Sequence, residues 1–369
     1  MTLSANTPRP NCLNLQTVKN TKSVSKQLYN KVYLVIGATE MVGAHLTCAM
    51  LRQGLSVRVA KAKGDDPAYI KHVLSFYTAD YEGQFNEIEW ADIDYDDITS
   101  LQDAMQGVCT VFCCKIPNLL RCRSINDNVL EIKNILNAAQ ESDLKGFVYL
   151  SSYRALGEEP DDKEVNEQSQ RNPKGKYIKF DIVHYRCEME VRRAMEEGLN
   201  ASILAPTVVL GPGNWITDTS HLIPETAQRR YFTYGVTGFV GVNDVVKCLM
   251  SLARNKIYGE KFIANSQNMS FLTLFNIIAQ KMSLPAPTKL ASKWIIRLYK
   301  FCHGFKSIFT GSRPIVNEPY IDSVTHYRLY DGSKSVNRLI AAYETIDSVV
   351  DTIAGIYKKE KEGFDINKS

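Results

Sequence analysis

The stretch KVYLVIGATEMVGAHL, Lys31–Leu46, decides the fold. Its apolar and β-branched residues at Val32–Ile36 predict a short buried strand. Gly37 permits a tight turn after the strand, and helical spacing resumes over Met41–Leu51. A strand, a glycine turn and a helix in this order open a βαβ nucleotide-binding unit. The sequence therefore predicts an α/β fold built on a doubly wound parallel sheet.

The turn itself departs from the usual dinucleotide-binding pattern. Such a turn has three glycines, and here Glu40 stands between Gly37 and Gly43. Backbone N–H groups of the turn and of the helix N-terminus normally face a pyrophosphate. We expect the Glu40 carboxylate to repel that group and its Cβ to hinder close approach of the backbone. The predicted cofactor contacts in this turn are Gly37, Thr39, Glu40, Met41, Val42 and Gly43.

Composition limits the possible function classes. A chain of 369 residues with 44% hydrophobic and 23% charged residues can bury a large core. The net charge of +4 is too small to argue for nucleic-acid binding. No apolar run approaches the ~20 residues of a transmembrane helix. The nine cysteines show no metal-ligand spacing, so we expect reduced thiols, no bound metal and a cytoplasmic protein.

The chain divides into four predicted parts. Residues 1–30 contain no Asp or Glu and no apolar secretory segment, so we expect a disordered extension, with an organellar transit peptide as the alternative. A Rossmann-type core follows over 31–210. A smaller α-rich substrate lobe, intertwined with the core, is expected over 211–357. A flexible tail begins at Lys358–Lys361 and covers 358–369.

Alternating strand and helix patterns continue through the core. Strands are predicted at Ser56–Ala62, Ile88–Ile93, Cys109–Cys114, Gly146–Leu150, Ala201–Leu204 and Lys261–Ala264. Helices are predicted at Thr99–Gln106, Ile125–Glu141, Ile178–Glu197, Phe239–Leu252 and Phe271–Met282, with Gly198 as a C-cap.

Ligands of parallel sheets lie at the carboxyl ends of the strands. The end of the second strand carries Lys61 and Lys63 and no acid, which favours NADP or no cofactor at all. Further cofactor contacts are predicted where later strands end, at Asp92, Ile93, Cys114, Lys115 and Pro206.

One segment of the predicted lobe is aromatic, basic and amphipathic. It is Lys293–Phe309, and it is typical of a helix that packs on the lobe or closes the pocket. Contact with a membrane surface is the alternative. Its mostly apolar content favours a hydrophobic ligand over a nucleotide sugar.

Five segments in chain order give a family resemblance that extends from about residue 31 to 357. They are VIGATEMVGAHL (35–46), NVLEIKNILNAA (128–139), VYLSSYRALGEE (148–159), EMEVRRAMEEGLNASILAPTVVLGPGNW (188–215) and TGFVGVNDVVK (237–247). The chain resembles the extended short-chain dehydrogenase/reductases, and within them the NAD-dependent epimerase/dehydratase group. This group includes dihydroflavonol reductases and 3β-hydroxysteroid dehydrogenase-like proteins. The resemblance implies NAD(P) binding, oxidoreductase or epimerase chemistry, and a homodimer formed by the helices at 125–141 and 178–197.

The resemblance also implies a catalytic Ser, Tyr and Lys, with the Tyr and Lys spaced as YxxxK. Tyr exchanges a proton with the substrate while the nicotinamide exchanges a hydride. Alignment on Glu188–Val191 places the Tyr position at Phe180 and the Lys position at His184. Ser152 stands at the Ser position. Phenylalanine has no ionisable oxygen, so the catalytic set is broken.

Three interpretations follow. In the first, the chain keeps the fold and has lost turnover, or retains very little. In the second, it is an active NAD(P)-dependent enzyme that uses His184 and Ser152. In the third, it is a partner- or membrane-surface-binding protein. A further hypothesis pairs Glu40 with Lys115 across the empty phosphate position. The sequence does not identify the small-molecule ligand.

Overall fold

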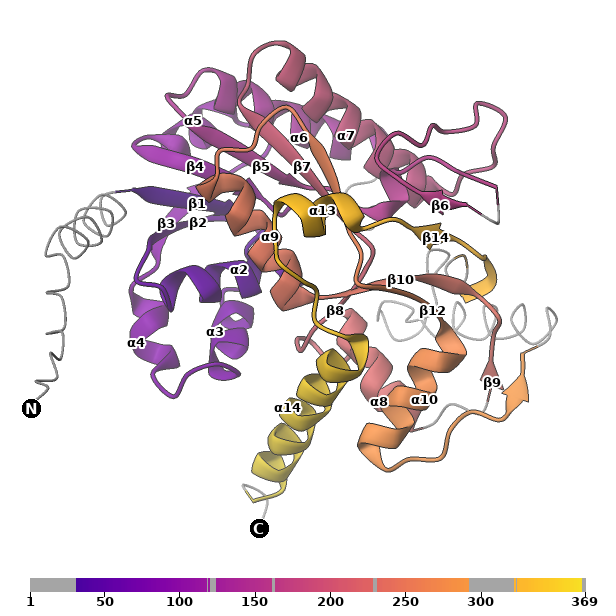
Figure 1. Cartoon of the computed structure of the whole chain (residues 1–369). Coiled ribbons are helices and arrows are strands. Elements are labelled where there is room, and N and C mark those ends of the chain that lie inside the picture. The colour runs from indigo at the N-terminus through magenta and orange to yellow at the C-terminus, as the bar shows by residue number, and fades with distance from the viewer. Residues whose placement is uncertain are drawn as a thin grey trace, which may run out of the picture.

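A seven-stranded, all-parallel sheet forms the centre of the molecule (Figure 1). The strand order is β11-β7-β5-β4-β1-β2-β3, so the chain winds outward in both directions from β1. This confirms the predicted fold class. The strands are β1 Val32–Ile36, β2 Ser56–Ala62, β3 Glu89–Ile93, β4 Val108–Cys113, β5 Gly146–Leu150, β7 Ala201–Pro206 and β11 Lys261–Ala264.

The structure is a computed structural model. It describes residues 31–366 except 118, 120–123, 161–162, 228–230, 292–321 and 323, and for 363–366 it describes the backbone alone. The predictions for residues 1–30 and for Lys293–Phe309 lie outside the described residues.

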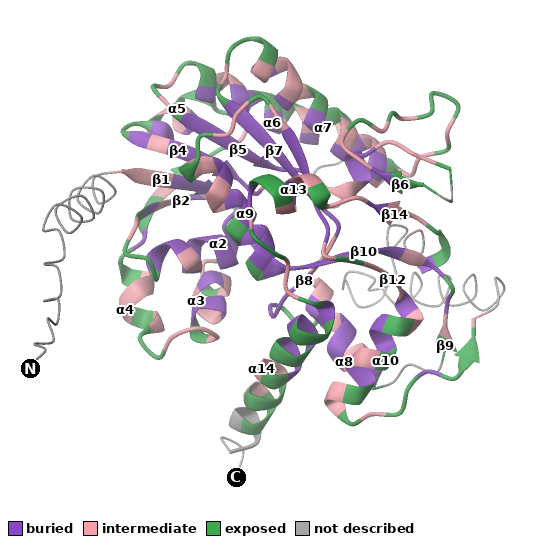
Figure 2. Cartoon of the chain, in the orientation of Figure 1, coloured by how far each residue is buried: buried purple, intermediate pink, exposed green. Residues whose placement is uncertain are grey.

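Helices cover both faces of the sheet, and alternate strand residues serve the two faces. In β1, Val35 belongs to one apolar cluster, while Leu34 and Ile36 belong to the other. The first cluster is completed by α2 (Met41–Leu51), α3 (Ala68–Ser75) and α9 (Val242–Arg254). The second is completed by α5 (Ile98–Met105), α6 (Ile125–Gln140) and α7 (Lys179–Glu196). Figure 2 shows the strands buried between these two layers.

The C-terminal part adds a small three-stranded sheet and its own helices. Its strands are β8 Val208–Leu210, β10 Val236–Gly241 and β12 Gln267–Ser270, and its main helices are α8 Leu222–Thr226, α10 Phe271–Met282 and α14 Ile346–Ile366. Phe239, Phe271 and Phe275 form the centre of its apolar cluster. Shorter elements are α4 Tyr81–Asn86, β6 Glu164–Val165, β9 Tyr231–Phe232, β13 Lys289–Leu290, β14 Leu329–Tyr330 and α13 Ser333–Arg338.

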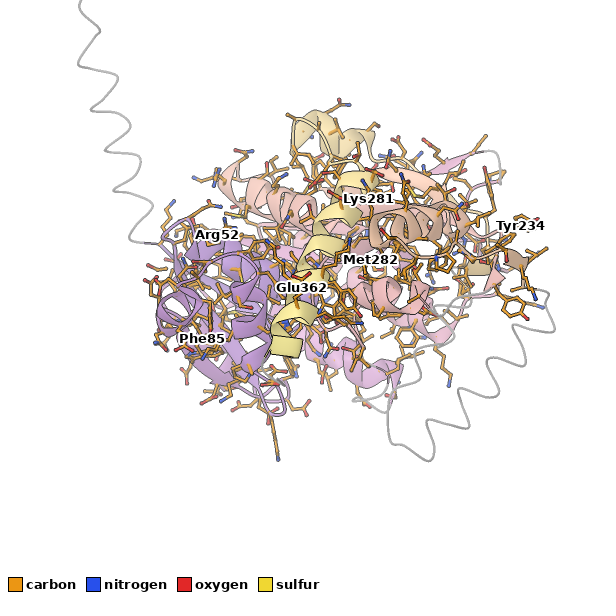
Figure 3. The ribbon with its side chains drawn as sticks, turned by 90° about the horizontal axis from the view of Figure 1, so that it is seen from below. Arg52, Phe85, Tyr234, Lys281, Met282 and Glu362 are labelled. Carbon is orange, nitrogen blue, oxygen red and sulfur yellow. The ribbon has the colours of Figure 1, made fainter. Side chains whose placement is uncertain are left out.

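Two of the sequence predictions need correction. The helix expected over Phe239–Leu252 begins only at Val242, because Phe239 lies in β10, where it pairs with Gln267 and Val208. The flexible tail expected from Lys358 is helical up to Ile366. Tertiary contacts hold this part of α14: Lys358 Nζ donates to the Lys281 carbonyl at 2.8 Å. Figure 3 shows Lys281 and Met282 beside α14.

Other predicted bounds agree with the structure. The first two strands, the first helix, β5, β11 and α10 have the expected residues, and the remaining core elements differ by a few residues at their ends. Gly198 follows α7 with a φ of +100°, the left-handed conformation of a helix C-cap. Of the helices described, none is long and apolar enough to cross a membrane.

Candidate functional site

The glycine turn between β1 and α2 depends on two glycines for its shape. Gly37 has a φ of +77°, and a Cβ there would lie 2.6 Å from the Lys115 backbone nitrogen. A Cβ on Gly43 would lie 2.1 Å from the Gly37 carbonyl oxygen. Both distances are far below van der Waals contact. Folding therefore requires these two glycines whether or not a ligand binds.

Glu40 occupies the middle of the three glycine positions, and its backbone is under no such constraint. It is the N-cap of α2 with φ −92° and ψ 156°, an extended backbone that any residue adopts. Its N–H donates to the Gly37 carbonyl at 3.1 Å, and its carbonyl accepts from Ala44 N–H at 2.9 Å. Its side chain is half-buried and lines the cavities on both sides of the turn. Only a ligand, and not the fold, would require glycine at this position.

A cavity of about 260 Å³ lies on the β2–β3–β4 side of the turn, where the family's cofactor would extend. Its lining includes five carboxylates and two ammonium groups. They are Glu40, Asp65, Asp94, Asp96 and Glu131 against Lys63 and Lys115. In the part of the lining that the structure describes, the carboxylates outnumber the cations, which disfavours an anionic ligand there.

One of these two cations is already paired. Lys115 Nζ lies 2.7 Å from Glu131 Oε2, with both side chains largely buried, and 4.4 Å from the centre of the Tyr95 ring. The hypothesis that Lys115 pairs with Glu40 is wrong, because the ion pairs of the described residues include Lys115–Glu131 and no Lys115–Glu40 pair. Lys115 is therefore held away from a phosphate role by its partner on α6.

The other predicted strand-end residues fall into two groups. Ile93 lines the same cavity, whereas Lys61 and Asp92 form an ion pair of 3.6 Å and do not line it. Cys114 is fully buried below the turn, where its N–H donates to the Ile36 carbonyl at 2.8 Å. The strand alternation explains the difference, because neighbouring residues on β2 and β3 face opposite sides.

A second cavity, of about 600 Å³, lies on the other side of the turn and contains the expected reaction centre. Residues predicted for the site from two parts of the chain line this cavity together. They are Ser152, Phe180, His184 and Pro206, and Thr39, Glu40, Met41 and Val42 of the turn. Ser152 follows β5 and caps a short 3₁₀ helix, its Oγ accepting from the Arg154 N–H at 3.3 Å. Phe180 and His184 lie one turn apart on α7 and face the same cavity.

His184 cannot take over the charge of the family's lysine. Its side chain is buried, and no hydrogen bond to its ring is found among the described residues. Burial lowers the pKa of His184 to about 3, and the neighbouring cations Arg154 and Arg171 lower it further in the same direction. The imidazole is thus neutral at physiological pH.

A buried cation that the sequence did not reveal lies beside this histidine. Arg154 Nη1 donates to Asp181 Oδ1 at 2.9 Å and lies 3.5 Å from Asp322 Oδ2. Arg171 fixes the same region by donating to the backbone carbonyls of Arg154 and Asp181 at 2.7 and 2.9 Å. A lone Arg two residues after Ser152 forms no motif, so only its sequence proximity to Ser152 could have pointed to it.

The far wall of the larger cavity holds another pair that sequence analysis missed. The Tyr69 hydroxyl donates to Asp218 Oδ2 at 2.5 Å, and Asp218 also accepts from the Asn214 N–H at 2.7 Å. Burial raises the pKa of Tyr69 well above its usual value, and Asp218 adds to the shift. The Tyr69 phenol is therefore committed to Asp218 and retains its proton.

These residues fit the outline of a dinucleotide site but not its central contact. The two packed glycines and the two cavities preserve the frame. Glu40 stands at the helix N-terminus, where the pyrophosphate belongs, and acids predominate beside it. For metal ions, the described residues contain no group of three or more His, Cys, Asp or Glu side chains that could hold one.

Comparisons with known proteins show which family and which fold this chain resembles. The profile of the NAD dependent epimerase/dehydratase family matches residues 33–262. A putative dihydroflavonol 4-reductase of Synechocystis is 26% identical over 319 residues, covering 83% of this chain and 89% of the relative. Cinnamoyl-CoA reductase 1 of Petunia hybrida is 24% identical, covering 76% and 86%. Among solved structures, vestitone reductase from alfalfa superposes with a TM-score of 0.65 at 16% identity, covering 89% of this chain and 99% of that one.

Proposed function

The chain belongs to the NAD dependent epimerase/dehydratase family, and from this premise we propose that it is a ligand-binding member without dehydrogenase or epimerase turnover. In this proposal the cavity of about 600 Å³ binds a small uncharged molecule, and the dinucleotide position next to it no longer holds NAD(P) at useful affinity.

The observation that carries the proposal is the replacement of the proton-transfer pair. The positions of the family's Tyr and Lys hold Phe180 and His184, which face the cavity together. Phenylalanine cannot exchange a proton. A histidine with a pKa of about 3 is neutral, and it is too weak a base for efficient proton transfer near neutral pH.

Three cavity-lining groups, Arg154, Tyr69 and Ser152, are poorly suited to replace the pair. Arg154 is committed to Asp181, and the Tyr69 phenol is committed to Asp218. Ser152 remains, but a serine hydroxyl without an activating partner is a poor acid and a poor base. The alternative of an active enzyme that uses Ser152 and His184 would need His184 to titrate near neutral pH, and its burial opposes that.

Glu40 supports the second part of the proposal. Its carboxylate is half-buried at the N-terminus of α2, where a cofactor pyrophosphate would bring two further negative charges. At a separation of about 4 Å, like charges near a protein surface repel by about 4 kcal/mol per pair. A repulsion of this size is enough to remove micromolar affinity.

The test is isothermal titration calorimetry of the full chain with NADPH and NADH, for the wild type and for Glu40→Gly. We expect no binding by the wild type below about 1 mM and an affinity at least about a hundredfold higher for Glu40→Gly. Asp66→Gly, at an exposed acid of the same groove, is the matched control and should bind no better than the wild type.

Turnover is tested separately with a triple variant that combines Glu40→Gly, Phe180→Tyr and His184→Lys. The assay follows NADPH oxidation in the presence of cinnamaldehyde-type and flavanonol-type carbonyl compounds. Activity gained only by the triple variant supports lost catalysis. Micromolar NADPH binding together with carbonyl reduction by the wild type would overturn the proposal.

A further inference from the structure

A third cavity lies at the opposite edge of the sheet, at the amino ends of β1, β4 and β5. It has a volume of about 480 Å³, within the range of small-molecule sites. Its apolar wall comes from α2, the α2–β2 connection, β4 and α9. The wall residues are Met50, Leu55, Phe112, Met250 and Ala253.

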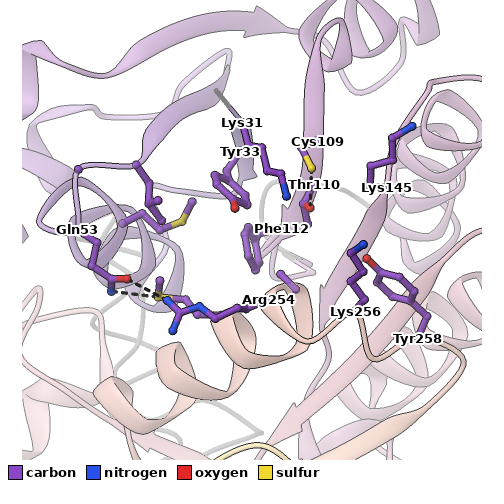
Figure 4. Close-up of a pocket in the computed structure, with 15 residues that line it drawn as sticks. Lys31, Tyr33, Gln53, Cys109, Thr110, Phe112, Lys145, Arg254, Lys256 and Tyr258 are labelled. Carbon is purple, nitrogen blue, oxygen red and sulfur yellow. Dashed lines mark hydrogen bonds between the residues drawn. The ribbon is translucent and has the colours of Figure 1, made fainter. Parts of the chain in front are cut away.

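Four cations lie around this apolar wall. They are Lys31, Lys145, Arg254 and Lys256, and the described lining residues include no Asp or Glu. Figure 4 shows Lys31 and Arg254 near the rings of Tyr33 and Phe112, and Lys145 and Lys256 on the side of Tyr258. Like charges gathered at one cavity repel each other, so a bound anion would stabilise the arrangement.

These cations form few ion pairs or hydrogen bonds with the rest of the described protein. Arg254 Nη2 donates to the neutral amide of Gln53 at 3.2 Å, and Lys145 pairs with the exposed Asp143 at 2.9 Å. Among the described residues, Lys31 and Lys256 form no ion pair. Lys256 has a φ of +52°, and it follows α9 at a point where glycine is favoured. The backbone there gains nothing from a lysine.

We propose that this amino-end cavity is a binding site for an amphiphilic organic anion, a carboxylate with an apolar tail. The apolar wall receives the tail, and the cations at the rim receive the carboxylate. The first 30 residues of the chain contain no acid and four Lys or Arg residues, so that segment would add positive charge and does not complement the cavity. The site is separate from the glycine turn, and its test does not depend on the proposed function.

The probe is octanoate, titrated calorimetrically into the full chain, with octan-1-ol and octylammonium as neutral and cationic controls. We expect octanoate to bind with a Kd below about 1 mM and the two controls at least about tenfold more weakly. Equal binding of octanoate and octan-1-ol would overturn the charge argument. No octanoate binding by the full chain would overturn the site, including the case in which another part of the chain fills it.

Variants locate the site. Arg254→Gln together with Lys256→Gly should weaken octanoate binding about tenfold or more. Because glycine suits the backbone of residue 256, that single substitution should raise the Tm, which separates lost binding from lost folding. Lys133→Gln, at an exposed position on α6, removes the same charge elsewhere and should leave binding unchanged. Equal binding by the double variant and the wild type would overturn the assignment.

Discussion

The two edges of the central sheet differ in charge, in the opposite sense to what the fold alone would suggest. At the carboxyl ends of the strands, where the family binds an anionic dinucleotide, acids outnumber cations among the described lining residues, and Glu40 occupies the turn. At the amino ends, the described lining of an apolar cavity holds four cations and no acid. The sheet fixes where cavities form, and the side chains at each edge decide which ligand charge a cavity accepts.

The two edges also differ in whether their cations form ion pairs within the protein. At the carboxyl edge, Arg154 and Lys115 are paired with buried or nearly buried carboxylates, Asp181 and Glu131. At the amino edge, Arg254 donates to the neutral amide of Gln53 and forms no ion pair with any other described residue. A cation that is already paired stabilises the protein, whereas a cation without a partner remains available to a ligand.

Replacing a cation that is paired with a buried carboxylate should have the largest effect on the free energy of unfolding. Arg154→Gln leaves the buried Asp181 without its main partner and should lower the free energy of unfolding by about 3–5 kcal/mol. Arg254→Gln at the amino edge should change it by less than about 0.5 kcal/mol. Urea denaturation of both variants measures the difference. Similar losses in both would show that the two edges do not differ in this way.

Substitution of Gly37 in the glycine turn should have the next largest effect on stability. Gly37→Ala places a Cβ against the Lys115 backbone at a positive φ and should cost about 2–3 kcal/mol of stability. Glu40→Gly, three residues later, should cost less than about 1 kcal/mol because its backbone is unstrained. Thermal denaturation distinguishes them. A large loss for Glu40→Gly would mean that the carboxylate serves the fold.

The pH dependence of stability tests whether the pKa of His184, at the carboxyl edge, is lowered. The pKa of folded His184 is about 3, below its unfolded value, so the unfolded chain binds a proton that the folded chain does not. Stability is therefore lost as the pH falls from about 6.5 towards 3. Between pH 7 and 4 the wild type should lose about 3 kcal/mol more than His184→Gln.

His45, whose pKa is lowered to about 4 mainly by burial, is present in both proteins and cancels in this comparison. Parallel stability curves for the wild type and His184→Gln would show that His184 titrates normally. That result would revive the acid–base role for this residue.

Salt should have the smallest effect. Octanoate binding at the cationic edge should weaken about threefold between about 50 mM and about 500 mM NaCl, because the charges are partly exposed. Binding of the Arg254→Gln, Lys256→Gly double variant should depend less on salt. Calorimetry at the two concentrations measures both slopes, and equal slopes would contradict a role for these two cations.

The sequence was sufficient to predict much of the core because its signals are local. Residues Val32–Ile36 and Met41–Leu51 form the strand and the helix at the predicted bounds, since β-branched runs and helical spacing act over neighbouring residues. The helix predicted over Phe239–Leu252 was wrong at its start, because pairing of Phe239 with two distant strands overrode the local pattern.

The gathering of Ser152, Phe180 and His184 in one cavity was also predictable, since a family alignment carries spatial information. Only the tertiary structure decided the electrostatic properties of the two edges. The pairing of Lys115 with Glu131, the neutrality of His184 beside Arg154, and the cationic cavity at the amino edge each join residues far apart in the chain. Charge and burial at a point depend on everything folded around it, and linear spacing does not record that.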